Sequence, residues 1–98
     1  MPSTLLTVVA EMVAKPGKEE ALKQELLKLI EPTRREEGCL QYDLHVATDH
    51  PGRFVFYENW TSRVALDKHL QSPHLQAFAK VAKDLREDPS IVTYTRIA

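Results

Sequence analysis

The spacing of apolar residues changes repeatedly along this chain, and the order of those changes constrains the fold more than any other feature. Alternating apolar residues are typical of β-strands, whereas apolar residues three and four positions apart are typical of amphipathic helices. The first pattern predicts strands at residues 4–14, 39–48, 53–60 and 91–97. The second pattern predicts helices at residues 18–36 and 63–71 and a further helical segment that begins at Pro73. The predicted order is therefore β-α-β-β-α-β.

Prolines and glycines mark the places where the pattern changes. A turn at residues 49–52 joins two alternating runs, so these runs are expected to form a hairpin. Pro32 removes a backbone hydrogen bond inside the first helix, which predicts a kink there. Ser72 followed by Pro73 is typical of a helix cap and a first helical residue, so the second helical region is expected to divide at this point.

This order of elements is typical of the split βαβ, or ferredoxin-like, α+β fold. Right-handed crossovers would place both helices on one face of a four-stranded antiparallel sheet. In the first strand, one side is uniformly apolar, formed by Leu6, Val8, Ala10 and Met12. The other side is mixed and has no helix to cover it, formed by Thr7, Val9 and Glu11. We therefore expect a single domain spanning residues 1–98, with a second copy of the chain covering the open face.

Charge and composition exclude several classes of protein. The chain has 98 residues and a formal net charge of -1, and its charges are interleaved, so we expect no nucleic-acid partner. The longest apolar run, at residues 5–10, is far shorter than the roughly 20 residues of a membrane span. A single cysteine, Cys39, favours a reducing, cytoplasmic setting and is expected to be a small buried hydrophobe.

Three segments carry a resemblance to a known family. They are Glu37–Tyr42 (EGCLQY), Phe56–Trp60 (FYENW) and His69–Leu75 (HLQSPHL). Together they resemble the antibiotic biosynthesis monooxygenase family, including its small quinol monooxygenase members. The resemblance implies a dimeric α+β barrel that oxidises quinol or phenol-like substrates with molecular oxygen and no cofactor. It also implies that Asn59 and Trp60 help to hold the substrate.

The third predicted strand offers a candidate catalytic pair. Alternation places Glu58 between Phe56 and Trp60 on one side of the strand, and a buried carboxylate needs a partner. His69 lies on the flank of the helical stripe that faces the sheet. We expect Glu58 to contact His69 and to orient it as a base that removes a phenolic proton. The alternative is a plain strand-to-helix contact, or two side chains that face solvent separately.

Further substrate-binding candidates lie nearby. His74 begins the next helical segment and either approaches the pocket mouth or faces solvent. Asn59 or His74 is expected to hydrogen-bond the substrate oxygen, with Trp60 as a wall for the ring. Tyr42 and Phe78 either line an apolar slot or belong to the core. His45, on the polar side of its strand, is expected at the dimer interface.

No cofactor is expected from the sequence. His69 and His74 are five positions apart across a proline, and Cys39 has no CxxC partner, so no metal site is predicted. Gly17, Gly38 and Gly52 form no nucleotide-binding motif, which argues against flavin and nicotinamide cofactors.

The leading interpretation is a homodimeric, cofactor-independent monooxygenase that uses a small aromatic substrate and molecular oxygen. The alternative is a non-catalytic dimeric module that binds a small molecule or serves in a stress response. A third possibility, an isomerase for a small phosphorylated compound, would need several converging Lys or Arg side chains, and the sequence nominates none.

Overall fold

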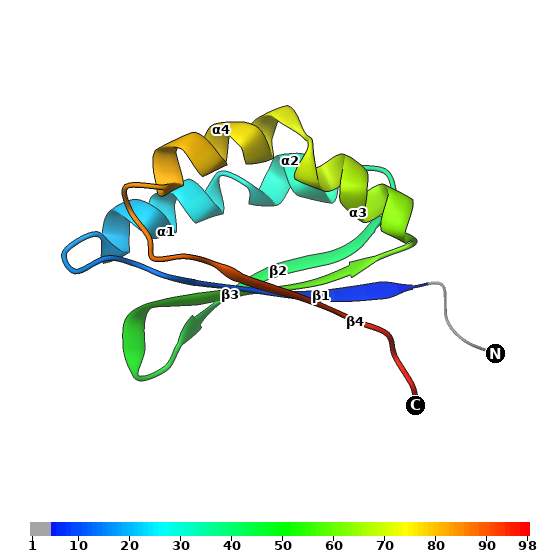
Figure 1. The fold of residues 1–98 in the computed structure, drawn as a ribbon, viewed down its shortest axis with the longest axis horizontal. Helices are drawn as coiled ribbons and strands as arrows, with labels where there is room; N and C mark the ends of the chain where they lie inside the picture. Colours follow the sequence, from blue (N-terminus) through cyan, green and yellow to red (C-terminus); the bar gives the residue numbers. More distant parts are fainter. Residues whose placement is uncertain (1–4) are drawn as a thin grey trace.

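The computed structural model describes residues 5–98 and contains one four-stranded antiparallel sheet with the strand order β2-β3-β1-β4 (Figure 1). The strands are β1 (Leu6–Val13), β2 (Cys39–Ala47), β3 (His50–Trp60) and β4 (Ser90–Tyr94). The ferredoxin-like α+β fold predicted from the sequence is confirmed. The largest differences from the expected strand boundaries are at the start of β3 and the end of β4. The β2–β3 hairpin closes through a two-residue turn, so β3 begins at His50, and β4 ends at Tyr94.

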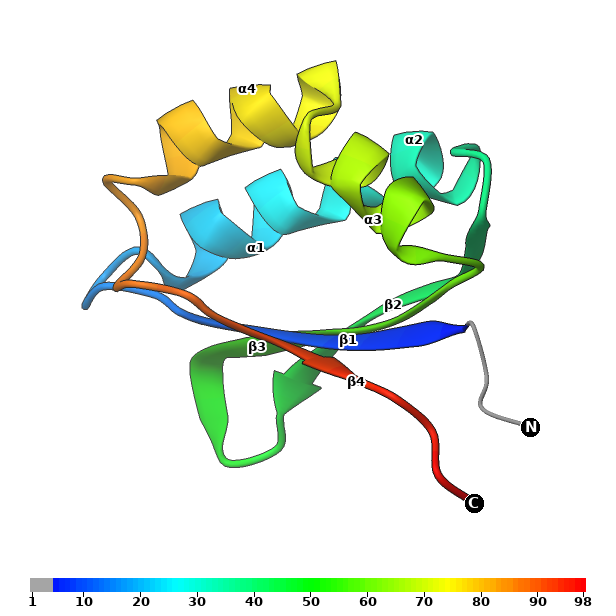
Figure 2. The same ribbon diagram turned by 45° about the vertical axis from the view of Figure 1, so that its right-hand side comes forward.

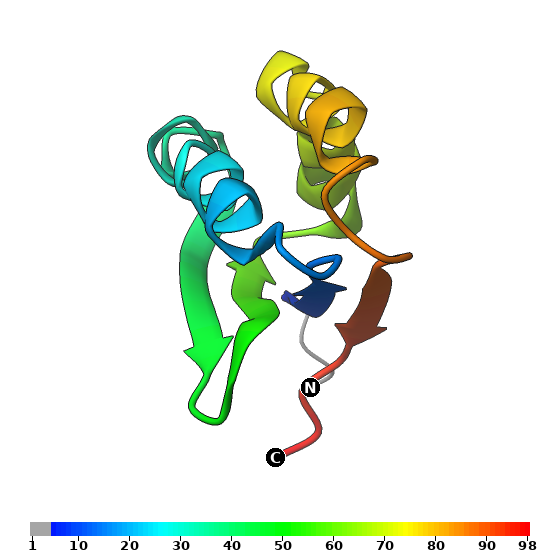
Figure 3. The same cartoon turned by 90° about the vertical axis from the view of Figure 1, so that its left-hand side faces the viewer.

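All four helices lie on the same side of the sheet (Figures 2 and 3). They are α1 (Glu19–Leu27), α2 (Ile30–Arg34), α3 (Arg63–Leu70) and α4 (Pro73–Ala82). They form two rows, α1 with α2 and α3 with α4 (Figure 3). The helix expected at residues 18–36 is interrupted at Lys28 and Leu29. In a continuous helix the ring of Pro32 would clash with the carbonyl of Lys28, and Pro32 has no N–H to donate to it.

Between sheet and helices lies the hydrophobic core. On β1, Val8, Ala10 and Met12 are buried, as their alternation predicts. Trp60 at the end of β3 is fully buried, and Leu22 and Leu26 bury the sheet-facing side of α1. The apolar stripes predicted from the sequence therefore define this interface.

A bulge at the start of β2 changes which side chains face the core. Cys39 pairs with Trp60 and Gln41 with Asn59, which leaves Leu40 as an extra residue. Leu40 is 56% exposed, whereas Tyr42 is buried. In a regular strand Leu40 and Tyr42 would lie on the same side, and the bulge breaks this alternation between them.

Gly38 allows the loop before β2 to run close to α3. Its φ is 87°, and a Cβ built there would lie 2.5 Å from Cβ of Ala65 and 2.7 Å from Oγ1 of Thr61. Its carbonyl accepts a hydrogen bond of 2.9 Å from the Thr61 amide. Any larger residue would push the loop, including Glu36, away from α3.

In the described part of the chain, residues 5–98, no helix covers the opposite face of the sheet (Figure 2). Exposed apolar side chains on or beside it include Leu40, Tyr57, Val92 and Tyr94. Within residues 5–98, none of the helices is both long and apolar enough to cross a bilayer.

Candidate active site

A cavity of about 270 Å³ lies between the sheet and the helices. Most of its lining is apolar, and the side chains that could take part in chemistry are His69 and Glu58, with Arg63 and Thr93 also present. Leu70 and Leu75, which flank the break between α3 and α4, are part of the lining. The break predicted at Ser72 and Pro73 therefore borders the cavity. The cavity contains one guanidinium, that of Arg63, and no Lys among the described residues, so it lacks the converging cations of a phosphate site.

His69 is held tightly beside this cavity. Its side chain is 3% exposed, and its ring lies 4.7 Å from that of Trp60 and edge-on to that of Tyr42 at 5.5 Å, between centroids. Nδ1 of His69 lies 2.7 Å from Oε2 of Glu36. Burial lowers the pKa of His69, and the carboxylate of Glu36 acts in the opposite direction. The ring is thus fixed at Nδ1 in surroundings that favour the neutral imidazole.

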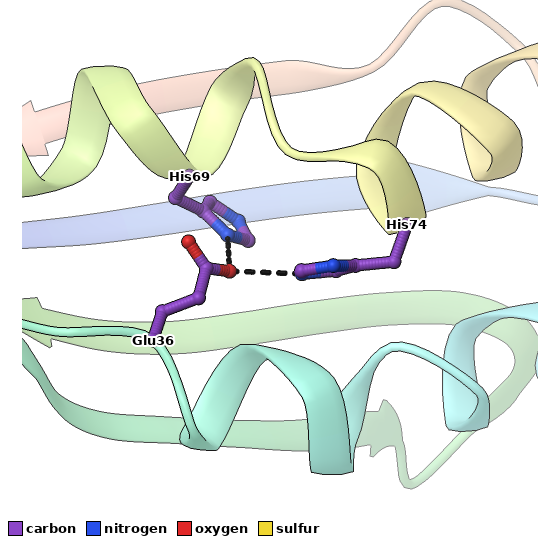
Figure 4. Close-up of side chains that lie close together, drawn as sticks. All are labelled: Glu36, His69 and His74. Atoms are coloured by element: carbon purple, nitrogen blue, oxygen red, sulfur yellow. Dashed lines mark hydrogen bonds and ion pairs between the residues drawn. The ribbon is translucent and has the colours of Figure 1, made fainter.

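Glu36 is a site residue that the sequence analysis missed. It follows α2 in the loop that leads to Gly38, and its side chain is 16% exposed. Its Oε2 contacts both Nδ1 of His69 and Nε2 of His74, the latter at 2.8 Å (Figure 4). No periodic pattern selects a loop residue. The available signal was its position directly before the Glu37–Tyr42 segment that carries the family resemblance.

The predicted contact between Glu58 and His69 is wrong. Glu58 instead accepts a hydrogen bond of 2.9 Å from Nε1 of Trp60, two residues along the same face of β3. Nδ1 of His69 is engaged by Glu36. Glu58 is 4% exposed, and burial raises its pKa to about 7 although the bond from Trp60 opposes this. Glu58 therefore lines the cavity as a carboxyl group that is part protonated near neutral pH.

His74 reaches the cluster because Ser72 separates two helices. The Ser72 hydroxyl donates to the His69 carbonyl at 2.7 Å and accepts from the Leu75 amide at 3.4 Å. These bonds end α3 and begin α4. His74, in the first turn of α4, keeps a side chain that is 23% exposed while Nε2 contacts Glu36. His74 thus lies part exposed with Nε2 turned towards Glu36, and it is not among the residues that line the cavity.

Asn59 lies on the other side of the sheet from His69. Its Oδ1 accepts from the Thr7 hydroxyl at 2.6 Å and its Nδ2 donates to Oε1 of Gln41 at 2.8 Å. It lines a groove on the open face, together with Leu5, Thr7, Leu40, Gln41, Tyr57 and Tyr94 to Arg96. Strand alternation separates Asn59 from Glu58 and Trp60, so these three residues cannot share one pocket within a single chain.

The three aromatic candidates differ in their surroundings. Tyr42 lines the cavity and stacks on Phe56 with centroids 4.4 Å apart, and burial raises its pKa well above its usual range. Trp60 and Phe78 are buried in the core and are not part of the cavity lining. Cys39, expected to be buried, is half-buried, and its surroundings raise the pKa of its thiol to about 11. Of the three, Tyr42 lines the cavity, whereas Trp60 packs against the ring of His69 in the core.

Comparison with known proteins places this arrangement in a family. Residues 5–81 match the family model described as "Antibiotic biosynthesis monooxygenase". The protein Rv0793 of Mycobacterium tuberculosis is 38% identical over 88 residues, which are 90% of this chain and 86% of that protein. The Escherichia coli K12 protein named "Probable quinol monooxygenase YgiN" is 30% identical over 89 residues, covering 81% of this chain and 86% of that protein.

The fold comparison agrees with the sequence comparison. The crystal structure of PA3566 from Pseudomonas aeruginosa superposes with a TM-score of 0.93 and 38% sequence identity, covering 98% of this chain and 97% of that chain.

Proposed function

Because the chain belongs to the antibiotic biosynthesis monooxygenase family, we propose that it oxidises a quinol or phenol-like substrate with molecular oxygen and without a cofactor. The observation that carries the proposal is the largely apolar cavity, into which a buried imidazole and a buried carboxyl group are built. Its volume of about 270 Å³ is near the lower limit of ligand pockets and suits one small aromatic ring. The name of the Escherichia coli relative supports a quinol as the first substrate class to test.

The reaction balances without an external reductant. A quinol with a free ring position and one molecule of oxygen give a hydroxyquinone and one molecule of water. One oxygen atom enters the ring carbon, and the other leaves as water with two hydrogen atoms of the substrate. The substrate supplies all four electrons. What the protein must contribute is removal of a proton, orientation of the ring and exclusion of water.

His69 is the proposed base. With Nδ1 held by Glu36, the neutral imidazole presents an unprotonated Nε2 that can accept the hydroxyl proton. Glu36 takes the orienting role that the sequence analysis gave to Glu58. Glu58, with its pKa near 7, is a second proton acceptor in the same cavity. Tyr42 and Phe56, stacked in the lining, form an aromatic wall for the ring.

A homodimer is part of the proposal. The open face carries exposed apolar side chains, among them Tyr57 and Val92, that a second copy of the sheet would cover. Such interfaces commonly bury roughly 2,000 Å² or more. Asn59 and His45 lie on this face, and the dimer would bury them away from the cavity of their own chain. A cytoplasmic location, argued from the single cysteine, belongs to the same proposal.

Oxygen uptake tests the proposal. The protein is mixed with a panel of quinols and phenols in chelator-treated buffer under ¹⁸O₂. We expect uptake with at least one substrate and one ¹⁸O atom in its product. No uptake across the panel would refute the proposal and favour the alternative of a non-catalytic binding module. Uptake with hydrogen peroxide as product and no labelled ring would refute monooxygenation.

A further inference from the structure

We propose that Glu36, His69 and His74 form a binding site for one divalent transition-metal ion of the Zn²⁺ type. The three ligand atoms, Oε2 of Glu36, Nδ1 of His69 and Nε2 of His74, lie within 4.8 Å of one another (Figure 4). Two imidazole nitrogens and one carboxylate oxygen are a ligand set that Zn²⁺ and its first-row neighbours bind, with further positions left to water.

The measured distances lie within reach of coordination. Oε2 of Glu36 is 2.7 Å from Nδ1 of His69 and 2.8 Å from Nε2 of His74. Ligands about 2.0–2.1 Å from a tetrahedral ion lie about 3.3 Å apart. Each of the two Glu36–His distances would therefore lengthen by about half an ångström. Glu36 and His74 are part exposed and can make this movement, and their exposure gives an ion access from solvent.

The charges around the cluster favour a cation. Within residues 5–98, the ion pairs of Glu36 are those with His69 and His74, so no Lys or Arg neutralises its carboxylate. A second carboxyl group, Glu58, is close enough for Glu36 to raise its pKa. Burial is the main cause of the raised pKa of Cys39 and of Tyr42, and both carboxylates add to it. Glu36 thus places a carboxylate, unpaired with Lys or Arg among the described residues, beside two imidazoles.

The ligands are positioned before any ion binds. Packing between Trp60 and Tyr42 fixes the His69 ring. The Ser72 cap, followed by Pro73, turns the chain so that His74 faces His69 across the helix break, with ring centroids 6.2 Å apart. Because this preorganisation lowers the entropy cost of gathering three side chains, the site should bind an ion more tightly than scattered surface histidines.

The inference does not depend on the proposed oxidation. Nδ1 of His69, which Glu36 holds in the proposed reaction, is the atom that an ion would take. The ion-loaded cluster and the reactive cluster are therefore two separate states of the same three side chains. Ion binding is measured on the protein alone, without substrate or oxygen uptake.

Isothermal titration calorimetry with Zn²⁺ on chelator-treated protein tests the site. We expect saturable binding of about one ion per chain. Visible absorption with Co²⁺ in place of Zn²⁺ should show the bands of a low-symmetry nitrogen and oxygen site. His74→Ala and Glu36→Gln should each weaken Zn²⁺ binding at least about tenfold. Glu36 and His74 are part exposed, so these two variants are expected to fold. They test the site even if the variant of the buried third ligand, His69→Ala, does not fold.

Two variants serve as matched controls. His50→Asn changes an exposed imidazole, and Glu37→Gln changes the exposed carboxylate next to Glu36 in the sequence. Neither should alter the affinity by more than about twofold. The asparagine side chain of the His50→Asn variant can still accept from the Gly52 amide, as the imidazole of His50 does. The proposal is overturned if the chain binds no Zn²⁺ saturably, or if binding survives His74→Ala and Glu36→Gln. It is also overturned if the controls weaken binding as much as the ligand variants do.

Discussion

The two faces of the sheet offer different chemical environments, although neighbouring residues of the same strands build both. On the helix-covered face, Glu58 and His69 are buried around a cavity and each has one specific hydrogen-bond partner. On the open face, Asn59 accepts a hydrogen bond from Thr7 and donates one to Gln41, in a part-exposed polar network beside exposed aromatic side chains.

This difference separates chemistry from association. The proposed proton removal and reaction with oxygen need a dry pocket with a positioned base, and on the helix-covered face a largely apolar cavity lies beside the buried imidazole of His69. The open face provides an extended surface of mixed polarity, typical of a subunit interface. Glu58 and Asn59 are adjacent in sequence, yet we assign Glu58 to the proposed catalytic cavity and Asn59 to the proposed dimer interface. The predictions below test this separation.

The largest expected effect is on turnover. His69→Ala should lower kcat by about 10²- to 10⁴-fold on a working quinol, because a general base contributes about this much. Asn59→Ala, which changes the open face, should lower kcat by less than about fivefold. Oxygen uptake by both variants, with folding checked by circular dichroism, measures the contrast. Equal losses in the two variants would contradict the separation of the faces.

Dimer formation should depend on the open face and not on the helix-covered side. Val92→Glu places a carboxylate on the open face, on the edge strand β4, where Val92 pairs with Val9 of β1. Burying an unpaired charge costs about 3 kcal/mol or more, so the dimer should weaken by about 100-fold or more. Val81→Glu is the control, because Val81 is similarly exposed (49% against 41%) but lies on α4. Sedimentation at micromolar concentration should give monomer for Val92→Glu and dimer for Val81→Glu. A dimer in both would place the interface elsewhere.

Stability should depend on pH through Glu58. Folding raises its pKa from 4.5 to about 7, so ionised Glu58 destabilises the folded state above that pH. Below about pH 4.5 the carboxyl group is protonated in both the folded and the unfolded protein, so this destabilisation is absent. The free energy of unfolding then falls as the pH rises through 7. Glu58→Gln should therefore raise the free energy of unfolding by about 2–3 kcal/mol at pH 8 and by little at pH 5.

Denaturant unfolding at a fixed protein concentration measures this effect, and Glu37→Gln provides an exposed carboxylate as control. A Glu58→Gln variant whose gain is the same at pH 5 and pH 8 would show that the charge of Glu58 is not the cause.

The smallest expected effect concerns the orientation of the base. Glu36→Gln should lower kcat by about tenfold with little change in KM, because one charge-assisted hydrogen bond contributes about 1.5 kcal/mol. Glu37→Gln should leave kcat unchanged. Steady-state oxygen uptake separates the two variants. If KM rises for Glu36→Gln and kcat does not fall, Glu36 contacts the substrate and does not orient His69.

Much of the fold could be predicted from the sequence, because short-range rules govern it. Alternation placed Val8 and Glu58 on the helix-covered face, and Pro32 indicated the interrupted helix. The bulge at Leu40 escaped prediction, since one unpaired residue leaves no mark in the apolar pattern. The sequence therefore predicts the fold where the spacing of apolar residues is regular. It does not predict a single residue that departs from that spacing, such as Leu40.

The candidate site was predicted only in part. His69 was placed beside the pocket because its helical position faces the sheet. Its partner was misassigned because Glu36 lies in a loop, 33 positions away, and meets His69 only through the close approach that Gly38 allows. Such a contact depends on how α2 ends relative to α3, which no local pattern encodes.

The most direct test of the central claim is to locate the bound substrate. Methyl-detected NMR of the protein with a quinol under anaerobic conditions reports on each face separately, because Val8 and Val9 point to opposite sides of β1. The account predicts shift changes at the methyl groups of Val8, Leu66 and Leu75, which line the cavity. Shift changes confined to Val9, Leu40 and Val92 would place the substrate on the open face and contradict the account.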